Sequence, residues 1–190
     1  MVSREIIYAN DSRLREKAKR VKQFGPPLKA LADDMLETMH ESHGIGLAAP
    51  QIGLLHRVFV AELPEDEEDP QSGKSFVLVN PEVVKTSRNE VEGEEGCLSI
   101  PTWIGLVWRP EWAVVKAQDV NGKPMRIKAK GLLARVFLHE MDHLDGVLFV
   151  DRVEDPEKLW QLKPEDLQEE TERQTEQEAE AQANAVAEMV

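Results

Sequence analysis

Apolar residues recur at helical spacing in two stretches of the chain. The first follows Pro26-Pro27 and extends to about Ser42; its apolar positions are Leu28, Leu31, Met35, Leu36 and Met39. This spacing predicts an amphipathic core helix. The second stretch, over about 132–145, is apolar almost all round, which indicates a buried helix. Gly146 follows it, where a left-handed helix cap is expected.

Between these stretches the pattern changes to short β-branched and aromatic runs, which predict strands over 57–61, 76–79, 83–85, 106–108 and 112–117. Asn121-Gly122, flanked by 114–115 and 125–127, is typical of a two-residue hairpin turn. The acidic segment 64–73 contains two prolines and is typical of a surface loop. The order of these elements predicts an α+β fold, with antiparallel or mixed β-sheets packed around the second helix.

A length of 190 residues and a hydrophobic content of 41% are ordinary for one globular domain. No apolar stretch suggests a membrane span, and charged residues such as Arg4 and Glu5 interrupt the beginning of the chain, which argues against a signal peptide. We therefore expect a cytoplasmic protein that does not contact a membrane. The one cysteine, Cys97, excludes an intrachain disulfide.

The formal charge of −13 is unevenly distributed. From Asp151 onward the chain has thirteen acidic and four basic residues, so this segment accounts for −9 and leaves −4 for the first 150 residues. The part after Leu167 is rich in Glu, Gln and Ala, which favours a detached helix or a disordered tail. We expect a catalytic domain over 1–150 and an acidic C-terminal extension over 151–190. No basic patch is strong enough to predict direct, sequence-specific nucleic-acid binding.

The second helical stretch contains the pentad His139-Glu140-Met141-Asp142-His143. Histidines four residues apart lie on the same helix face, so both imidazoles can reach one divalent ion, while Glu140 can reach a water bound to it. Ionised groups in an apolar helix are costly unless they are paired or bind a metal. The pentad therefore predicts a metal-dependent hydrolase.

Two histidines leave a catalytic metal short of a third protein ligand, and two other segments are unusual. Segment 94–99 places Cys97 beside a glycine, and segment 44–53 is a run of small residues that contains Gln51. Each segment is weak evidence by itself. A lone cysteine is more often a small core residue than a ligand, and a Gly-x-Gly sequence is more often a turn than a binding loop.

Taken together and in this order, the three segments resemble the motifs of the peptide deformylases. Those motifs are a Gly-x-Gly-x-Ala-Ala-x-Gln loop, a Glu-Gly-Cys-Leu-Ser stretch and a Gln-His-Glu-x-x-His-Leu-x-Gly helix. The resemblance covers roughly residues 4 to 150 and leaves the acidic tail outside. It departs from the family pattern at one position, where Leu138 stands in place of the usual glutamine.

The resemblance implies that Cys97, His139 and His143 hold one divalent metal ion per chain. Family members commonly use Fe²⁺ in the cell and accept Zn²⁺, Ni²⁺ or Co²⁺, and a Cys-His-His set suits several of these ions. The implied reaction is hydrolytic removal of the N-formyl group from the initiator methionine of newly synthesised polypeptides, with release of formate. The metal would lower the pKa of its water and so provide a hydroxide nucleophile.

The resemblance also implies roles for residues beside the metal. Glu140 would act as the general acid and base. The Gln51 side-chain amide and the Leu98 backbone N–H match the family's oxyanion donors. Glu95 and Asp142 adjoin metal ligands, where carboxylates normally orient them, and Arg109 is a candidate partner for one of the two. Leu138 removes a polar group beside His139, although no ligand is lost.

Substrate contacts are expected from the first motif and from the helix. Gly44 and Gly46 would let a peptide backbone approach closely and pair like an added strand. Three residues share the helix face of His139 and would line the methionine pocket: Leu132, Arg135 and Val136. Ile45 would close the opposite wall, and Glu95 would border the pocket. Arg135 would contribute only its aliphatic stem and keep its charge near water.

Two rival readings stay open. A zinc peptidase shares the pentad but takes its third ligand from a Glu or His further along the chain. A non-catalytic relative would use the metal only to hold the fold together or to bind formylated chain ends. The remaining histidines, His40, His43 and His56, all precede the pentad, and we expect His43 to be structural. Action on nascent chains implies transient ribosome contact, which phosphate repulsion would keep away from the acidic tail.

Overall fold

The computed structural model describes residues 2–163, and the architecture below refers to this range. The expected tail after Leu167 lies outside the described residues. The two helices are α1 (Pro26–Glu41) and α2 (Gly131–Leu144). The strands are β1 (Gly46–Ala48), β2 (Val58–Glu62), β3 (Ser75–Thr86), β4 (Glu90–Cys97), β5 (Ile100–Pro110), β6 (Trp112–Gln118), β7 (Pro124–Lys130) and β8 (Leu159–Gln161). Short 3-10 turns cover Ser12–Arg15, Ala49–Ile52, Phe149–Arg152 and Pro156–Lys158.

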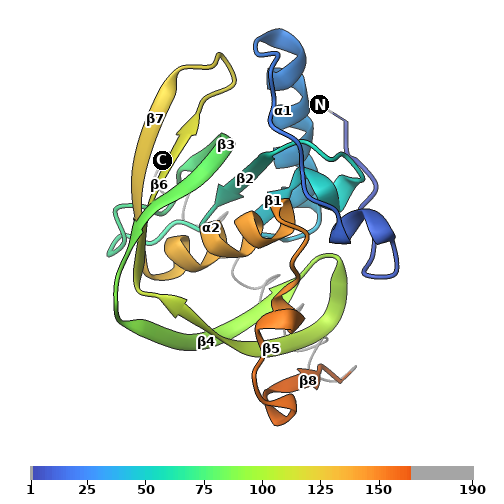
Figure 1. Cartoon of the computed structure of the whole chain (residues 1–190), viewed down its shortest axis with the longest axis vertical. Helices are drawn as coiled ribbons and strands as arrows, with labels where there is room; N and C mark the ends of the chain where they lie inside the picture. Colours follow the sequence, from blue (N-terminus) through green and yellow to red (C-terminus); the bar gives the residue numbers. More distant parts are fainter. Residues whose placement is uncertain (1, 164–190) are drawn as a thin grey trace, which may run out of the picture.

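The strands form two antiparallel sheets. The larger has the order β1-β2-β3-β6-β7, and the smaller has the order β4-β5-β8. Helix α2 runs between them (Figure 1) and contacts β1, β2, β6 and β7 of the larger sheet and β5 of the smaller one. The predicted α+β fold, with antiparallel sheets packed around the second helix, is confirmed.

The larger sheet is covered on both faces at its centre. In β2, Phe59 and Ala61 pack in the core cluster around α2, whereas Val58 and Val60 pack in the cluster under α1. Phe137 of α2 makes an edge-to-face contact with Phe59 at a centroid distance of 5.3 Å. Successive side chains of β2 therefore point into two apolar clusters on opposite faces of the sheet. This explains why the run is apolar without interruption.

Strand β3 unites two segments that the sequence pattern separated, 76–79 and 83–85. Its pairing with β6 is irregular between Val79 and Glu82 and again between Val83 and Lys85. Asn80 has a positive φ of 52° and is followed by Pro81, so the alternation of apolar residues is interrupted without ending the strand. The prediction of two separate strands was wrong for this reason.

The hairpin predicted around Asn121-Gly122 is confirmed as the connection between β6 and β7, but the connection is longer than two residues. The ladder closes at Gln118 and Pro124. Between them, the Asp119 carboxylate accepts hydrogen bonds from the backbone N–H groups of Asn121 and Lys123, both at 2.8 Å. A side chain thus supplies part of the turn's hydrogen bonding.

Beyond α2 the chain returns to the smaller sheet. Gly146 has a φ of 76°, which confirms the predicted left-handed position after the helix. Strand β8 then pairs with β5, with Leu159 opposite Gly105 and Gln161 opposite Trp103. Residues 151–163 therefore contribute a strand to the folded structure. No helix within residues 2–163 is long and apolar enough to cross a membrane.

Candidate active site

Three side chains with metal-binding atoms meet between β4 and α2. Cys97 ends β4, and His139 and His143 lie one turn apart on α2. Their ligand atoms all lie within 4.8 Å of one another, and the Cys97 Sγ is 3.2 Å from the His143 Nε2. The pairing of β4 with β5 shifts register between Gly96 and Cys97, so an irregularity of the strand falls directly beside the cysteine.

The chemistry of this donor set fits a divalent transition-metal ion. One soft thiolate sulfur and two imidazole nitrogens form a donor set that divalent iron, zinc, nickel and cobalt accept. The His139 Nδ1 donates a hydrogen bond of 2.9 Å to the Glu95 Oε2, so the other ring nitrogen is free to face the cysteine. Cys97, His139 and His143 would hold such an ion through three protein ligands, and a catalytic site would keep a further position for water or substrate.

The two histidines have opposite pKa shifts. Burial disfavours the protonated form of both rings, but hydrogen bonds to Cys97 and Glu95 outweigh it at His139 and raise the pKa of that ring well above its ordinary value. Burial, together with the nearby His139, holds the pKa of His143 well below its ordinary value. The two rings therefore differ in their surroundings: His139 is hydrogen-bonded to Glu95, whereas the His143 Nδ1 has no hydrogen-bond partner within residues 2–163.

Glu95 is anchored by a buried arginine. Arg109 donates from its Nε and Nη2 to the two carboxylate oxygens, at 2.8 and 2.9 Å, and from its Nη1 to Asp142 at 2.7 Å. Arg152 also donates to Asp142, at 2.6 Å. Burial alone would raise the pKa of Glu95, but Arg109 and His139 lower it to about 2. The carboxylate that holds His139 is therefore ionised and fixed, and Arg109 contacts both of the carboxylates that we paired with it as alternatives.

Glu140 is a buried carboxyl group that directly follows His139 on α2. It is 3% exposed, and its Oε2 has no hydrogen-bond partner within the described part of the chain. Burial raises the pKa of Glu140 to about 7. Gly46 of β1 lies against it: a Cβ at this position would stand 2.4 Å from the Glu140 Oε1 and 2.9 Å from a methyl carbon of Val136. Only glycine leaves room for this carboxyl group.

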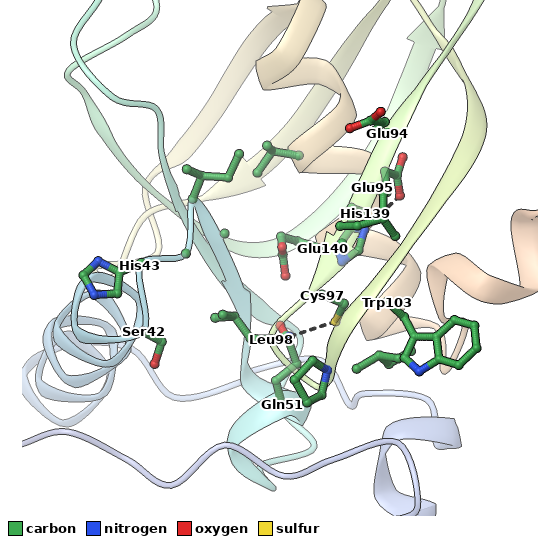
Figure 2. Close-up of a pocket in the computed structure, with 18 of the residues that line it drawn as sticks. Ser42, His43, Gln51, Glu94, Glu95, Cys97, Leu98, Trp103, His139 and Glu140 are labelled. Atoms are coloured by element: carbon green, nitrogen blue, oxygen red, sulfur yellow. Dashed lines mark hydrogen bonds and ion pairs between the residues drawn. The ribbon is translucent and has the colours of Figure 1, made fainter. Parts of the chain in front are cut away.

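The amide of Gln51 is oriented by its own loop. Gln51 is 1% exposed, and its Oε1 accepts a hydrogen bond of 2.8 Å from the Ala48 backbone N–H. The Nε2 end then points toward Cys97, at 3.5 Å from the Sγ (Figure 2). Leu98 follows the cysteine and lines the same cavity. The carboxamide of Gln51 and the thiol of Cys97 thus lie side by side in the cavity.

The cavity has a volume of about 620 Å³. Its lining includes every residue that the sequence predicted for substrate contact, namely Gly44, Ile45, Gly46, Glu95, Leu132, Arg135 and Val136. Leu132 is 50% exposed, whereas Val136 is 5% exposed, so the apolar wall runs from solvent to the interior. His143, 1% exposed, is not among the lining residues.

Arg135 differs from the expectation that its charge would stay near water. Its side chain is 13% exposed. The guanidinium donates to Glu95 and to three backbone carbonyl oxygens of β4 and β5. That part of the sequence prediction was wrong, because helical spacing locates the Cα but not the acceptors that other elements bring to the end of a long side chain.

Several lining residues were not predicted. They come from the end of α1 and from the return of the chain into β5, and they are Ser42, His43, Ile100, Pro101, Thr102, Trp103 and Ile104. Figure 2 shows His43 and Trp103 on opposite sides of the metal-binding group. The segment 100–104 directly follows the cysteine motif, which is the one signal in the sequence that could have placed it here.

Leu138, the residue that departs from the family pattern, does not line this cavity. It lines a separate hollow of about 290 Å³, together with Arg109, Asp142 and Arg152. It also packs against the core cluster around α2. Leu138 therefore lies beside the Arg109–Asp142 ion pair, and the glutamine usual in the family would stand in this separate hollow.

Comparison with known proteins gives one consistent family. The family model for polypeptide deformylase matches residues 3–159. The chain is 47% identical over 167 residues to a peptide deformylase of Thermomicrobium roseum, covering 87% of this chain and 94% of that protein. It is 50% identical over 150 residues to the Picosynechococcus enzyme of the same name, covering 79% of each chain.

Solved structures agree with these sequence relatives. The peptide deformylase of Thermotoga maritima superposes with a TM-score of 0.76 at 35% identity, covering 82% of this chain and 100% of that one. The Synechococcus elongatus enzyme in complex with actinonin gives a TM-score of 0.74 at 46% identity, covering 81% and 82%. The chain belongs to the polypeptide deformylase family, metal-dependent hydrolases that remove N-formyl groups from nascent peptides.

Proposed function

We propose that this chain hydrolyses the formyl amide of the initiator methionine, with Cys97, His139 and His143 holding one divalent metal ion and Glu140 acting as general acid and base. The observation that carries the proposal is the convergence of one thiol and two imidazoles, within 4.8 Å, beside a buried carboxyl group. We propose Fe²⁺ as the ion in the cell, with Zn²⁺, Ni²⁺ or Co²⁺ as functional substitutes.

When bound, the ion would polarise the formyl carbonyl and make a water molecule more acidic. Glu140 supplies the proton transfers. The water oxygen bonds to the formyl carbon while Glu140 takes a proton from that water, and the same proton then passes to the amide nitrogen as the C–N bond breaks. The products are formate and a free α-amine. A buried carboxyl group with a pKa of about 7 suits both directions of transfer near neutral pH.

Negative charge develops on the formyl oxygen during the attack. The Gln51 Nε2 and the Leu98 backbone N–H are proposed as donors to this oxygen. The hydrogen bond from Ala48 supports the role of Gln51, because it fixes the amide before substrate arrives. A donor held in advance needs no rearrangement when charge appears.

The peptide is proposed to pair with β1, which is an edge strand of the larger sheet. Gly44 and Gly46 lie on the cavity side of this segment and leave space for a second backbone. Ile45, Leu132 and Val136 provide an apolar wall for the methionine side chain. Pairing through the main chain would accept many sequences after the methionine, as an enzyme of nascent chains requires.

The two rival functions make different predictions. A zinc peptidase would take a later Glu or His as third ligand, whereas within residues 2–163 the one set of three or more converging donors is Cys97, His139 and His143. This favours the deformylase. A non-catalytic relative is disfavoured by Glu140, a buried carboxyl group whose Oε2 has no hydrogen-bond partner within residues 2–163.

The proposal is tested by formate release from formyl-Met-Ala-Ser. Anaerobically purified protein, with its metal quantified, is compared with Glu140→Gln and Cys97→Ala. We expect the Glu140 variant to keep its metal and lose activity by about 10²- to 10⁴-fold, and the Cys97 variant to lose both. Fully metallated wild type that releases no formate would contradict the proposal, and peptidase activity that survives Cys97→Ala would favour the rival enzyme.

We propose nascent formylated chains as the partners and the cytoplasm, where translation occurs, as the location. We propose that ribosome contact is transient and does not use the acidic segment after residue 163, because nine of its residues are acidic and one is basic. Co-sedimentation with ribosomes at low salt should be the same for the full chain and for residues 1–163. A loss on truncation would contradict this.

A further inference from the structure

The guanidinium of Arg135 makes several hydrogen bonds that lining the methionine pocket does not require. Its Nη1 donates to the Glu95 Oε1 at 3.0 Å, to the Gly93 carbonyl at 3.1 Å and to the Val107 carbonyl at 2.9 Å. Its Nη2 donates to the Val91 carbonyl at 2.8 Å. One guanidinium on α2 thus holds the backbone of β4, the backbone of β5 and the carboxylate that orients His139.

The guanidinium of Arg135 lies directly against the backbone of Gly93. A Cβ on Gly93 would lie 2.7 Å from the Arg135 Nη2 and 2.9 Å from its Cζ. Gly93 pairs with Val107 in the β4–β5 ladder, so the arginine sits against one rung of the smaller sheet. Gly93 lies four residues before Cys97, and Arg135 lies four residues before His139.

The two carboxylate oxygens of Glu95 accept hydrogen bonds from different sets of donors. The Oε1 receives Arg135 and the Arg109 Nε, whereas the Oε2 receives the Arg109 Nη2 and the His139 Nδ1. With Arg135 held on one oxygen, the other stays directed at His139. Arg135 can therefore fix the ring orientation of a metal-binding histidine that it does not touch.

We propose that Arg135 is a positioning residue that aligns the β4 ligand with the α2 ligands: through Gly93 it sets the path of β4 toward Cys97, and through Glu95 it sets the ring of His139. This inference rests on the proposed function and deepens it. The role goes beyond lining the pocket, because it depends on the guanidinium and not on the aliphatic stem.

Three variants separate the guanidinium from the stem. Arg135→Met keeps an apolar stem and removes the donors. Arg135→Lys keeps the charge, but a single ammonium cannot reproduce a planar donor that reaches four acceptors. Gly93→Ala leaves Arg135 chemically intact and displaces it. Arg126→Ala is the matched control, since Arg126 is an exposed arginine on β7.

The first measurement is metal affinity by chelator competition with Co²⁺, together with the visible absorption spectrum of the Co²⁺ protein. We expect Arg135→Met to raise the Co²⁺ dissociation constant by about 10- to 100-fold, as loss of a residue that supports a metal ligand does, and to change the spectrum. Gly93→Ala and Arg135→Lys should change both in the same direction, and Arg126→Ala should change neither.

The second measurement is the kinetics on formyl-Met-Ala-Ser at saturating metal. A positioning role predicts a lower kcat with KM close to that of wild type, whereas a pocket role alone predicts a higher KM with kcat retained. If Arg135 acts partly through Glu95, the effects of Arg135→Met and Glu95→Gln on Co²⁺ affinity should be less than additive in the double variant.

Reduced thermal stability with unchanged Co²⁺ affinity, spectrum and kcat would overturn the inference and leave Arg135 a structural residue. Full additivity with Glu95→Gln would overturn the route through Glu95. The Co²⁺ affinity and the Co²⁺ spectrum do not depend on the proposed reaction. A wild type that binds Co²⁺ but releases no formate would contradict the proposed function, while the affinity and spectral comparisons would still decide the role of Arg135.

Discussion

Gly46 shows how one missing side chain makes space for chemistry. Alanine at this position would place a Cβ 2.4 Å from the Glu140 Oε1, a separation that forces either β1 or the carboxyl group to move. We expect Gly46→Ala to reduce kcat for formyl-Met-Ala-Ser by about 10²-fold, the cost of a displacement near 1 Å at a reacting group. Metal content should be retained, because neither a ligand nor Glu95 is touched.

Gly44→Ala provides the comparison for Gly46→Ala. Its added Cβ would meet the Leu98 side chain at 2.8 Å, and the end of a leucine side chain can rotate away at small cost. The loss of activity should therefore be clearly smaller than at Gly46. Equal losses in the two variants, measured by formate release at saturating substrate, would mean that the Glu140 contact is not what position 46 protects.

Glu95 makes the stability of the protein depend on acid. Its pKa is about 2 in the folded protein against an ordinary 4.5, so between these values the unfolded chain binds more protons than the folded one. The stabilisation is complete above about pH 4.5 and is lost as the pH falls toward 2. Its size is on the order of a few kcal/mol, because one pKa unit corresponds to about 1.4 kcal/mol.

Glu95→Gln tests this linkage. The variant should be less stable than wild type at neutral pH, since Arg109 and Arg135 lose a carboxylate, and its free energy of unfolding should fall less steeply between pH 4.5 and 2. Urea unfolding of both proteins after metal removal measures the difference, because acid would otherwise also release the ion. Parallel pH profiles would show that Glu95 is not the group responsible.

At the residue scale, the sequence predicted which residues belong to the site better than it predicted the contacts that the ends of their side chains make. Four-residue spacing places His139 and His143 on one face by helix geometry alone. The resemblance of motifs supplied Cys97, whose approach to α2 no local pattern could reveal. The guanidinium of Arg135 was misplaced because its acceptors belong to β4 and β5, at sequence separations of 28 to 44 residues.

At the scale of elements, the local sequence pattern predicted the helices and strands that have a clear apolar periodicity or turn residues, and it missed a strand that has neither. Helix α1, helix α2 and the β6–β7 hairpin follow from periodicity and turn residues. Strand β4, which carries the cysteine, was not predicted, because its burial alternates little and six of its eight residues are Glu or Gly. Its strand character comes from pairing with β5 and not from an apolar face.

The β6–β7 turn offers a test of an element that the sequence did predict. Gly122 has a φ of 84°, a conformation that costs a residue with a side chain about 1–2 kcal/mol. A Cβ there would also lie 3.2 Å from the Phe24 ring. Gly122→Ala should lower the free energy of unfolding by about that amount in urea titration, with kcat unchanged because the turn is remote from the cavity residues.

At the scale of the whole molecule, the expected boundary at residue 150 can be tested by two truncations. A chain ending at residue 163 keeps β8 on β5 and the Arg152–Asp142 pair. We expect its thermal midpoint and formate release to match those of the full chain. A chain ending at residue 150 loses both contacts and exposes the outer edge of β5, so its midpoint should fall by several degrees.

The matched comparison for the two truncations is Arg152→Ala in the full chain. If the loss in the shorter chain came only from the Asp142 contact, this substitution would reproduce it. A larger loss on truncation would assign the remainder to β8 and to the contacts of Asp151 with Arg15 and with the Leu148 backbone. Equal stability of both truncated chains would show instead that residues 151–163 are dispensable, as a boundary at residue 150 implies.

The proposed ligand atoms come from two layers of the fold, and this affects the stage of folding at which a metal ion can bind. Cys97 and His143 are 46 residues apart in the chain, and they meet only after the smaller sheet has closed over α2. A folding intermediate with α2 docked on the larger sheet alone would offer two imidazoles and no thiol. We therefore expect metal to bind only after the smaller sheet has docked, and a bound ion would hold the two layers together, so unfolding should be slower in the metal-loaded protein than in the metal-free protein.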